Sequence, residues 1–483
     1  MRPKGGLRAQ ASQALREELA DAAASEVAGF VAAAVAAAGR DGEVFDLVED
    51  AARACAGRIA NRMVEGAAAM VATSQPRVSV CGCGRELGAH SARARTMMTM
   101  TGPVAVTRAY FYCRACGEGS APADRVLGVD GETCSTALRR AFAAAGQEVA
   151  FARAARLVGE VAGAALVSAK TCDRIVKRAG RAAREMVGEE AAALHGNPAA
   201  VRRAWDNAAT AYVMIDGTGA PMVPKETAGR AGKQPDGTAR TVEAKIARFM
   251  VQSGHGPDGR PLLLPGSTSY VATFESSGDF AATVAAEALR RDFPHAPRLA
   301  VVADGARWIW KLADLLWPGS VQIVDFYHAA EHAHDLAELL GPHLPGGHAR
   351  AALAQRLRGL LAAGRIQALA DAARAVELPT EELQARLETA VGYFTRNAHR
   401  MRYARFKKQG LWIGSGAVEG ACKNLVEARA AQSGMRWTID GLDPVIALRA
   451  LNRSDDQAGQ RHNRIWDRTS PRTLQVPHAH QQT

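Results

Sequence analysis

The stretch that decides the fold is Ala211-Tyr-Val-Met-Ile-Asp-Gly-Thr218. Its apolar centre, residues 213–215, predicts a short buried strand, and the glycine after Asp216 interrupts the pattern. A carboxylate at the exit of a buried strand is costly unless something compensates its charge. The same layout recurs at residues 299–305, where an apolar run is followed by Asp304 and a glycine. Two strands that each end in Asp-Gly predict a shared site for divalent metal ions.

The length and composition indicate a soluble, multidomain protein. The chain has 483 residues, of which 48% are hydrophobic and 23% are charged, so there is room for three or more domains. The formal net charge of +11 favours a polyanionic partner. The longest uncharged apolar run, from Val27 to Gly39, is mostly alanine; it is too short to span a bilayer and too weakly apolar for a signal peptide. We therefore expect a cytoplasmic protein without a membrane partner.

Residues 1–75 are rich in alanine and predict two helices. Approximate helical stripes of apolar side chains run through residues 15–31 and 44–71, and Gly39 and Gly42 separate them. No residue pattern in this segment points to chemistry. We interpret it as a helical arm or a dimerising pair.

Four cysteines in residues 76–128 predict a structural zinc site. They form a Cys-x-Cys and a Cys-x-x-Cys pair, and thiolates are preferred zinc ligands that leave no open position when there are four. The segment between the pairs alternates and has a turn at Gly102-Pro103, which predicts a hairpin of the zinc-ribbon type. The alternative is a small β unit with free thiols. The predicted ligands are Cys81, Cys83, Cys113 and Cys116. The other cysteines stand alone and are interpreted as small core residues: Cys55, Cys134, Cys172 and Cys422.

Residues 129–200 predict helices, including a motif like a helix-turn-helix. A short helix is expected at residues 151–163, and Ser168 is expected to cap a basic second helix after a tight connection. The second helix of such a motif enters the major groove of DNA, so Lys170 and Arg174 are candidate DNA contacts. The alternative is a basic, solvated helix in a bundle.

Residues 204–328 alternate between strands and helices. The expected strands are 211–216, 219–223, 242–252, 299–303 and 321–324, with a turn at Gly217-Thr218 and helices at 279–293 and 308–317. The first three strands suit an antiparallel meander, and the later strands alternate with helices. This order predicts a ribonuclease H-like core, a mixed sheet flanked by helices, within a multidomain α+β chain.

Residues 329–410 predict helices only, which indicates an all-helical insertion. Between Arg396 and Lys408, six Lys or Arg residues are interleaved with two aromatic residues, a combination that suits a phosphate backbone with exposed bases. The alternative is a solvated helix face. The candidate DNA contacts here are Arg400, Arg402, Lys407 and Lys408.

Residues 411–455 are expected to close the core with helices, and residues 456–483 form a tail. Glu419 begins a helix after a glycine-rich turn, where a third carboxylate can swing toward Asp216 and Asp304. Such an oxygen set suits Mg²⁺ or Mn²⁺, and two such ions serve phosphoryl transfer on DNA. The alternative is that one or more of these acids only cap helices or turns. Lys423 and Arg429 of the same helix are candidates to neutralise DNA phosphate.

Several motifs resemble those of one enzyme family. The stretches MIDGTGAPMV, VVADGARWIW, VDFYHAAEH, GSGAVEGACKNLVEAR and SGMRW are similar to those of DDE transposases of bacterial insertion sequences, nearest the ISKra-type group, with Mutator-like elements as wider relatives. The resemblance covers residues 76 to 455. It implies a ribonuclease H-like catalytic domain in which Asp216, Asp304 and Glu419 bind the metal ions. It also implies that Asp325 and His328 form the Asp-x-x-His element that follows the second Asp in Mutator-like enzymes.

The resemblance implies a two-step reaction on double-stranded DNA. Water attacks a phosphodiester at the end of the element and frees a 3′-hydroxyl, which then attacks target DNA in the same site. Because two element ends must be joined, a homodimer or a higher homo-oligomer is expected. The alternatives are a ribonuclease H-like nuclease in repair and a non-catalytic DNA-binding regulator derived from a transposase.

Overall fold

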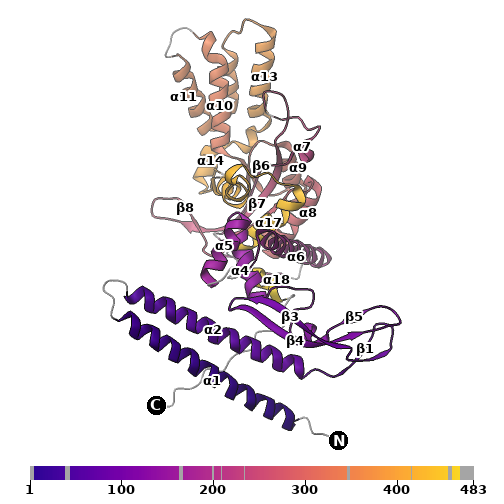
Figure 1. Ribbon diagram of the computed structural model, residues 1–483. Coiled ribbons are helices and arrows are strands. Elements are labelled where there is room, and N and C mark those ends of the chain that lie inside the picture. Colours follow the sequence, from indigo (N-terminus) through magenta and orange to yellow (C-terminus); the bar gives the residue numbers. More distant parts are fainter. Residues whose placement is uncertain are drawn as a thin grey trace. The chain divides into compact units, whose positions relative to one another are not determined.

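The computed structural model describes residues 5–38, 44–162, 167–197, 201–207, 209–232, 234–344, 349–414, 416–454 and 460–467 (Figure 1). Contacts within the chain divide it into two compact units. The first comprises Met1–Val176 and Arg464–Thr483, and the second comprises Lys177–Asn463. Both helices and strands occur in each unit, so the chain has a mixed α+β fold.

The first unit begins with a helical hairpin, as the alanine-rich segment predicts. Helices α1 (Gly5–Ala37) and α2 (Val44–Thr73) pack along each other (Figure 1). Gly66 permits their close approach, since a Cβ at this position would lie 2.6 Å from Leu15 Cδ1. Arg58 Nε also forms an ion pair with Glu26 Oε2 at 2.6 Å. The two glycines expected to separate the helices lie outside the described residues.

Helix α1 is longer than the apolar run that begins at Val27. That run alone was expected to be too short to span a membrane. By length and composition, its segment Ser12–Ala37 could cross a membrane, with a mean hydropathy of 1.5 and no buried residues in the most apolar part. Core helices and signal sequences often have the same length and composition, so this finding assigns no location.

The expected β hairpin follows in the first unit. Strands β3 (Ser91–Thr99) and β4 (Gly102–Tyr112) pair antiparallel with Thr99 opposite Gly102, so the turn residues are Met100 and Thr101 rather than the predicted Gly102-Pro103. Short strands extend the unit on either side: β1 (Val78–Val80), β2 (Glu86–Gly88) and β5 (Gly119–Ser120).

A buried carboxylate joins this hairpin to the short helix α3 (Pro122–Val126). Asp124 of α3 accepts hydrogen bonds from Arg95 of β3 and Arg108 of β4, each at 2.7 Å. Two guanidinium groups compensate the charge of a carboxylate that is only 6% exposed. The α3 helix is thereby fixed on the face of the hairpin.

Helices follow in the region where a helix-turn-helix is predicted. They are α4 (Thr136–Gly146), α5 (Phe151–Ala162) and α6 (Ala169–Gly196). Ser168 is the predicted N-cap of α6, since its Oγ accepts from the backbone N–H of Thr171 at 3.3 Å. Residues 163–166 of the connection lie outside the described residues, and α6 has 28 residues and continues into the second unit. The helix-turn-helix therefore stays a prediction.

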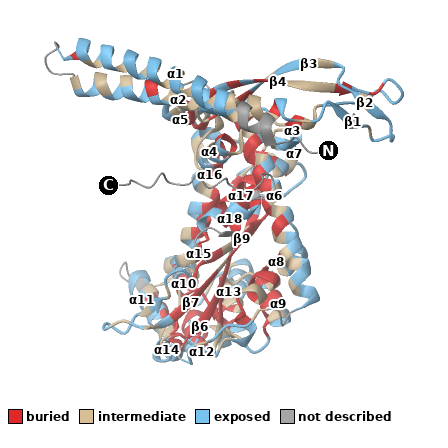
Figure 2. Ribbon diagram, turned by 90° about the horizontal axis from the view of Figure 1, so that it is seen from below, coloured by how far each residue is buried: buried red, intermediate tan, exposed pale blue. Residues whose placement is uncertain are grey.

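The second unit is built on a mixed six-stranded sheet. Its strands are β6 (Thr210–Pro221), β7 (Thr241–His255), β8 (Pro261–Leu263), β9 (Ser269–Thr273), β10 (Leu299–Ala303) and β11 (Val321–Val324). The order is β11-β10-β6-β7, and β8 and β9 both pair with β7. Strands β10 and β11 run parallel to β6, whereas β7 runs antiparallel to it. Figure 2 shows buried residues concentrated in β6, β7 and β9.

The turn predicted at Gly217-Thr218 is wrong. Strand β6 continues straight through it, with Gly217 paired to Lys245 of β7. The glycine leaves space for the Glu243 carboxylate, since a Cβ there would lie 2.4 Å from Glu243 Oε1. The strand expected at residues 219–223 is the continuation of β6, and β8 and β9 were not predicted.

Two helices connect the later strands of the sheet, and a separate group of helices follows β11, where the helical insertion was predicted. Helices α8 (Ser277–Arg290) and α9 (Arg307–Leu316) connect β9, β10 and β11 in sequence. Helices α10 (Phe326–Leu340), α11 (Ala349–Ala362), α12 (Ile366–Arg374) and α13 (Glu381–Arg396) then pack together (Figure 1). The remaining helices are α7 (Pro224–Thr227), α14 (Tyr403–Lys408), α15 (Gly416–Ala421), α16 (Ala428–Ala430), α17 (Ile439–Arg453) and α18 (Gln460–Asp467).

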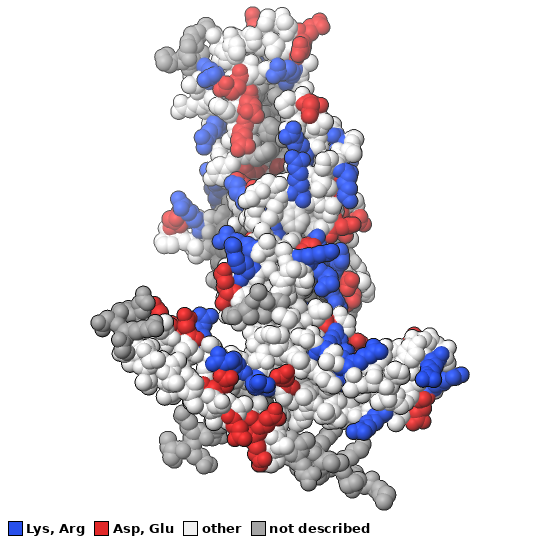
Figure 3. All heavy atoms as spheres, viewed as in Figure 1, with Lys and Arg blue, Asp and Glu red and all other residues white. Residues whose placement is uncertain are grey.

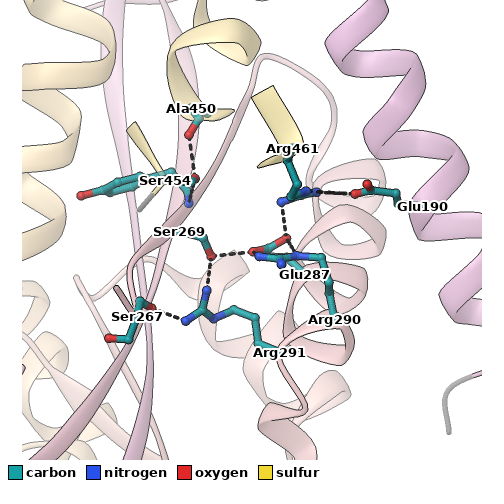
Figure 4. A network of polar contacts seen from close by, with 10 residues as sticks. Glu190, Ser267, Ser269, Glu287, Arg290, Arg291, Ala450, Ser454 and Arg461 are labelled. Atoms are coloured by element: carbon teal, nitrogen blue, oxygen red, sulfur yellow. Dashed lines mark hydrogen bonds and ion pairs between the residues drawn. The ribbon is translucent and has the colours of Figure 1, made fainter. Parts of the chain in front are cut away.

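A buried ionic network holds several of these elements together (Figure 4). Glu287 of α8 accepts from Arg290 at 2.8 Å, from Arg461 of α18 at 3.1 Å and from Ser269 of β9 at 2.5 Å. Arg461 also pairs with Glu190 of α6 at 2.6 Å. Burial raises the pKa of Glu287, but the arginines outweigh it and lower the pKa to about 2. The carboxylate therefore stays ionised in the core.

Candidate active site and candidate metal centre

The four cysteines predicted to bind zinc lie together in the first unit. Their Sγ atoms are all within 4.8 Å of one another, with Cys81 and Cys116 at 3.3 Å and Cys83 and Cys113 at 3.7 Å. Four thiolates around a zinc ion, at a Zn–S distance of about 2.3 Å, stand roughly 3.8 Å apart. The cluster can therefore hold a metal such as zinc, and four thiolates fit a structural role.

Two tight backbone turns present these thiols, one closed by a hydrogen bond across three residues and the other by one across four. Cys81 O accepts from Gly84 N, and Cys113 O accepts from Gly117 N, both at 2.8 Å. Each turn ends in a glycine with positive φ, +85° at Gly84 and +74° at Gly117, which other residues rarely adopt. Because strands β3 and β4 of the hairpin separate the two turns in sequence, hairpin pairing brings the cysteines together.

Three aspartates lie at one level of three adjacent parallel strands in the second unit: Asp216 within β6, and two others directly after β10 and β11. Ile215 of β6 pairs with Ala303 of β10, and Ala303 pairs with Val324 of β11. The next residue on each strand is an aspartate: Asp216, Asp304 and Asp325. Neighbouring strands lie about 4.8 Å apart, so this register lines up the three residues where β10 and β11 end beside the continuing strand β6.

Asp216 and Asp304 influence each other electrostatically. Burial raises the pKa of Asp216 above its usual value, and the nearby charge of Asp304 adds to the rise. Each carboxylate has a backbone partner: Asp216 Oδ1 accepts from Gly217 N at 2.7 Å, and Asp304 Oδ1 accepts from Ala306 N at 2.8 Å. Carboxylate oxygens are ligands that hard divalent cations prefer. Among the described residues, however, the four cysteines are the group whose ligand atoms converge closely enough to hold a metal ion, so the acids of the second unit do not form a preassembled site.

Asp325 and His328 occupy the start of α10. Asp325 is buried and caps the helix, its Oδ1 accepting from the backbone N–H of His328 at 2.6 Å. The His328 ring stands edge-on to His332, with centroids 4.9 Å apart. Burial lowers the pKa of His332, and His328 lowers it further, so His332 favours the neutral form. Asp325 therefore acts as a helix cap, a role that was not predicted for it, beside a polar cluster near Asp304.

Tyr393 of α13 joins this cluster and was not predicted. Its ring lies against His332, with centroids 4.1 Å apart, and against Gly305, where a Cβ would collide with the ring. Burial raises the pKa of Tyr393, and Asp304 and Asp325 raise it further. The hydroxyl is buried without a hydrogen-bond partner. The glycine after Asp304 was the one sequence feature that indicated a close contact here. It did not identify Tyr393 as the residue in contact.

Glu419 lies on a helix that packs against the same strands. Helix α15 contacts β6 and β7, and Cys422, one turn after Glu419, lies 3.5 Å from Asp216 Oδ2 through its Sγ. Burial raises the pKa of the Cys422 thiol, and Asp216 and Glu419 both contribute to the rise. The Glu419 carboxylate itself is exposed and pairs with Lys423 at 2.6 Å. The third acid thus belongs to the helix that touches Asp216, with its side chain turned to Lys423.

A further acid, Glu427, approaches from the same helix. Residues Cys422–Glu427 form a π-helical segment, a rare geometry that is often found at functional sites. Glu427 Oε1 accepts from the Thr218 hydroxyl at 2.7 Å, two residues beyond Asp216. The wider helical turn was not predictable from spacing, and Glu427 was not singled out.

Two predicted DNA contacts are wrong because their side chains are engaged in the interior. Arg429 is fully buried, with its guanidinium carbon 4.8 Å from the ring centre of Trp437. Arg400 has a side chain that is only 12% exposed; it donates to Gln322 at 2.6 Å and stacks on Trp310. The other six candidates are exposed: Lys170, Arg174, Arg402, Lys407, Lys408 and Lys423.

The basic residues do not form one continuous stripe on the face drawn in Figure 3. Lys and Arg side chains gather there in several groups with acidic side chains between them. The net charge of the chain therefore does not outline a binding path on this face.

In comparisons with known proteins, no protein-family model matches the chain, and no curated protein is significantly similar to it.

Proposed function

We propose that this chain is a DDE transposase of a bacterial insertion sequence, with a ribonuclease H-like catalytic core in its second unit. The support is the register of the mixed sheet, in which Ile215 pairs with Ala303 and so sets Asp216 beside Asp304. The antiparallel pair β6–β7, followed by parallel strands that alternate with helices, fits this type of core.

The chemistry of three acidic side chains supports a site for divalent metal ions that assembles when Glu419 turns toward the aspartates. Asp216, Asp304 and Glu419 offer only carboxylate oxygens, the ligands that Mg²⁺ or Mn²⁺ prefers. When bound, such ions activate the attacking oxygen and stabilise the leaving oxygen of a phosphodiester. Asp216 and Asp304 are held in place by strands and by backbone N–H groups, so little reorganisation is needed on their side.

Glu419 has to exchange its partner in this proposal. Its carboxylate pairs with Lys423, and both side chains are about 60% exposed. An exposed ion pair of this kind contributes little stability and is readily given up. Release of Glu419 toward Asp216 frees Lys423 to contact a DNA phosphate, so the two changes support each other.

Other parts of the chain have roles in binding DNA. The exposed cations Arg402, Lys407 and Lys408 lie on and next to α14 in the same unit. In the first unit, the cysteine cluster and the basic start of α6, with Lys170 and Arg174, would recognise the ends of the element. Joining two ends calls for a homodimer or a larger assembly.

Cleavage of the DNA that flanks this reading frame tests the proposal. The purified protein should cut labelled flanking DNA with Mg²⁺ or Mn²⁺, and Asp216→Ala and Glu419→Ala should each abolish cutting. Asp371→Ala, an exposed acid on α12, is the matched control and should cut normally. Full cutting by Asp216→Ala would contradict the proposed site.

The products separate the related functions. Covalent joining of the cut ends to a second DNA identifies a transposase. Cutting at unrelated sequences without joining identifies a nuclease. Specific binding to flanking DNA with no cutting by the unaltered protein identifies a regulator.

A further inference from the structure

A cavity of about 590 Å³ lies on the sheet of the second unit. Its lining includes Met214 of β6, Met250 of β7 and Leu263 of β8, together with residues 410–414, 416 and 417. These side chains make the inner wall apolar. The volume lies within the range of about 300–1,000 Å³ that is usual for small-molecule pockets.

The cavity shares a wall with the carboxylate cluster. Tyr327, which lines it, is two residues after Asp325. The backbone at Gly414 lies against both, since a Cβ there would be 2.8 Å from the Tyr327 ring and 3.7 Å from Asp325 Oδ2. Phe326 N donates to Ile413 O at 2.8 Å and fixes this junction. A ligand in the cavity is therefore close to Asp325, one of the three neighbouring aspartates.

Two aromatic side chains of different exposure line this space. Tyr327 is 64% exposed, which is unusual for a large aromatic residue beside a cavity. Trp412 is half-buried and fixed, with its ring 5.1 Å from that of Tyr212 and its backbone N–H donating to the Tyr212 hydroxyl at 3.1 Å. One ring is thus held in the wall, and the other is available to stack on a ligand.

Cations lie around the apolar wall. Lys407 is exposed with its Nζ 5.7 Å from the Phe326 ring centre, and the Arg260 side chain is 85% exposed. Asp258 offsets part of the Arg260 charge at 3.3 Å. Arg248 donates to Ala417 O at 2.9 Å through Nη1, while its buried Nε has no partner. The surroundings therefore favour an anion attached to an apolar, flat group.

We propose that this cavity, the Tyr327 pocket, binds one unstacked nucleobase of the DNA strand that is cut. This inference rests on the proposed function and names a subsite of it. A base stacks on Tyr327 and enters the apolar wall, while its flanking phosphates lie near Lys407 and Arg260. Enzymes that act on DNA commonly remove a base from the stack to reach or distort their target, and aromatic stacking repays part of that cost.

The test uses a forked DNA probe that is bound without cleavage. The full chain is mixed, in EDTA, with a fluorescent duplex that ends in four unpaired nucleotides, and with the same duplex without the unpaired end. Tyr327→Ala should weaken binding to the fork by roughly tenfold and leave the blunt duplex unaffected, because stacking involves only the unpaired base. Tyr327→Phe keeps the ring and should retain the preference, and Phe45→Ala, an exposed aromatic on α2, is the control.

A second readout locates the base. A 5-iodouracil in the unpaired end should crosslink on irradiation to the peptides that contain Tyr327 or Trp412, and Leu263→Trp, which fills the pocket, should remove that crosslink. An unchanged fork preference in Tyr327→Ala, or crosslinks only to other peptides, would overturn the inference. Neither readout needs a metal ion or cutting, so a failure of the proposed catalytic function is seen separately in the cleavage assay.

Discussion

Asp216 and Asp304 stand side by side on neighbouring parallel strands, because the residues before them, Ile215 and Ala303, are paired in register. Neighbouring carboxylates repel each other. Burial raises the pKa of Asp216, and the charge of Asp304 raises it further. The pair is therefore unfavourable in the protein alone and favourable around a cation. This relation gives the first prediction.

Asp304→Asn should be at least as stable as the unaltered protein without a divalent ion, and less stable than it when the ion is present. Without metal, the free energy of unfolding should stay the same or rise, because a repulsion is removed. With Mn²⁺ present, the unaltered protein should gain about 2.7 kcal/mol at a concentration 100 times the Kd, and the variant should gain much less. Thermal unfolding with and without Mn²⁺ measures both; an equal gain in the two proteins would show that Asp304 does not bind the ion.

Cys113→Ser should remove bound zinc from the first unit. The four Sγ atoms within 4.8 Å predict one zinc per chain, and a serine in place of one thiolate leaves an incomplete tetrahedron. Metal analysis of the purified protein measures the stoichiometry, and Cys55→Ala, a buried cysteine outside the cluster, should keep one zinc. The prediction fails if the unaltered protein, purified without chelator, carries no zinc.

Glu287→Gln should destabilise the second unit and alter its pH dependence. Removing one partner from a buried ionic network costs about 3–5 kcal/mol, since the arginines lose their counter-charge. The pKa of Glu287 is lowered from 4.5 to about 2, so its contribution is complete above pH 4.5 and is lost as the pH falls toward 2. Urea unfolding at several pH values should show the difference between the two proteins shrinking over that interval.

A surface pair provides the control for this network. Glu388→Gln breaks the exposed pair with Arg374, whose side chains are 46% and 41% exposed, and should leave stability nearly unchanged. If Glu287→Gln is no more harmful than Glu388→Gln, the buried network does not stabilise the protein as inferred.

Tyr393→Phe should stabilise the protein in the absence of DNA. The Tyr393 hydroxyl is buried without a partner, and such a group costs about 1–3 kcal/mol, so its removal should raise the free energy of unfolding by about 1 kcal/mol. Gly305→Ala should act in the opposite direction, because the added methyl group meets the Tyr393 ring. Denaturant unfolding of both variants checks the signs, and a loss of stability in Tyr393→Phe would indicate an unrecognised hydrogen bond.

Short apolar runs predicted the central strands well. Strands β10 and β11 begin and end at the predicted residues, because β-branched and small apolar residues there are bounded by charged or turn-forming ones. The dipeptide Asp-Gly was misread at Gly217, where the glycine accommodates the Glu243 side chain across the strand pair. A local signal could not distinguish a turn from a close approach.

Only part of the candidate site was predicted, because local sequence patterns do not show how distant elements pack. The position of Asp304 follows from the end of β10, which the sequence pattern located, whereas Asp216 lies within β6 and not at its predicted end. Tyr393 could not be predicted, since its approach to Gly305 depends on how α13 packs. Arg429 was misjudged because the cation contacts Trp437 inside the fold, and charge alone says nothing about burial.

Anomalous diffraction from crystals soaked in Mn²⁺ tests the central claim most directly. The account predicts at least one manganese peak within about 2.2 Å of carboxylate oxygens from both Asp216 and Asp304, with Glu419 turned from Lys423 toward the same site. No peak between Asp216 and Asp304, or a peak with Glu419 still paired to Lys423 and no path to the ion, would contradict it.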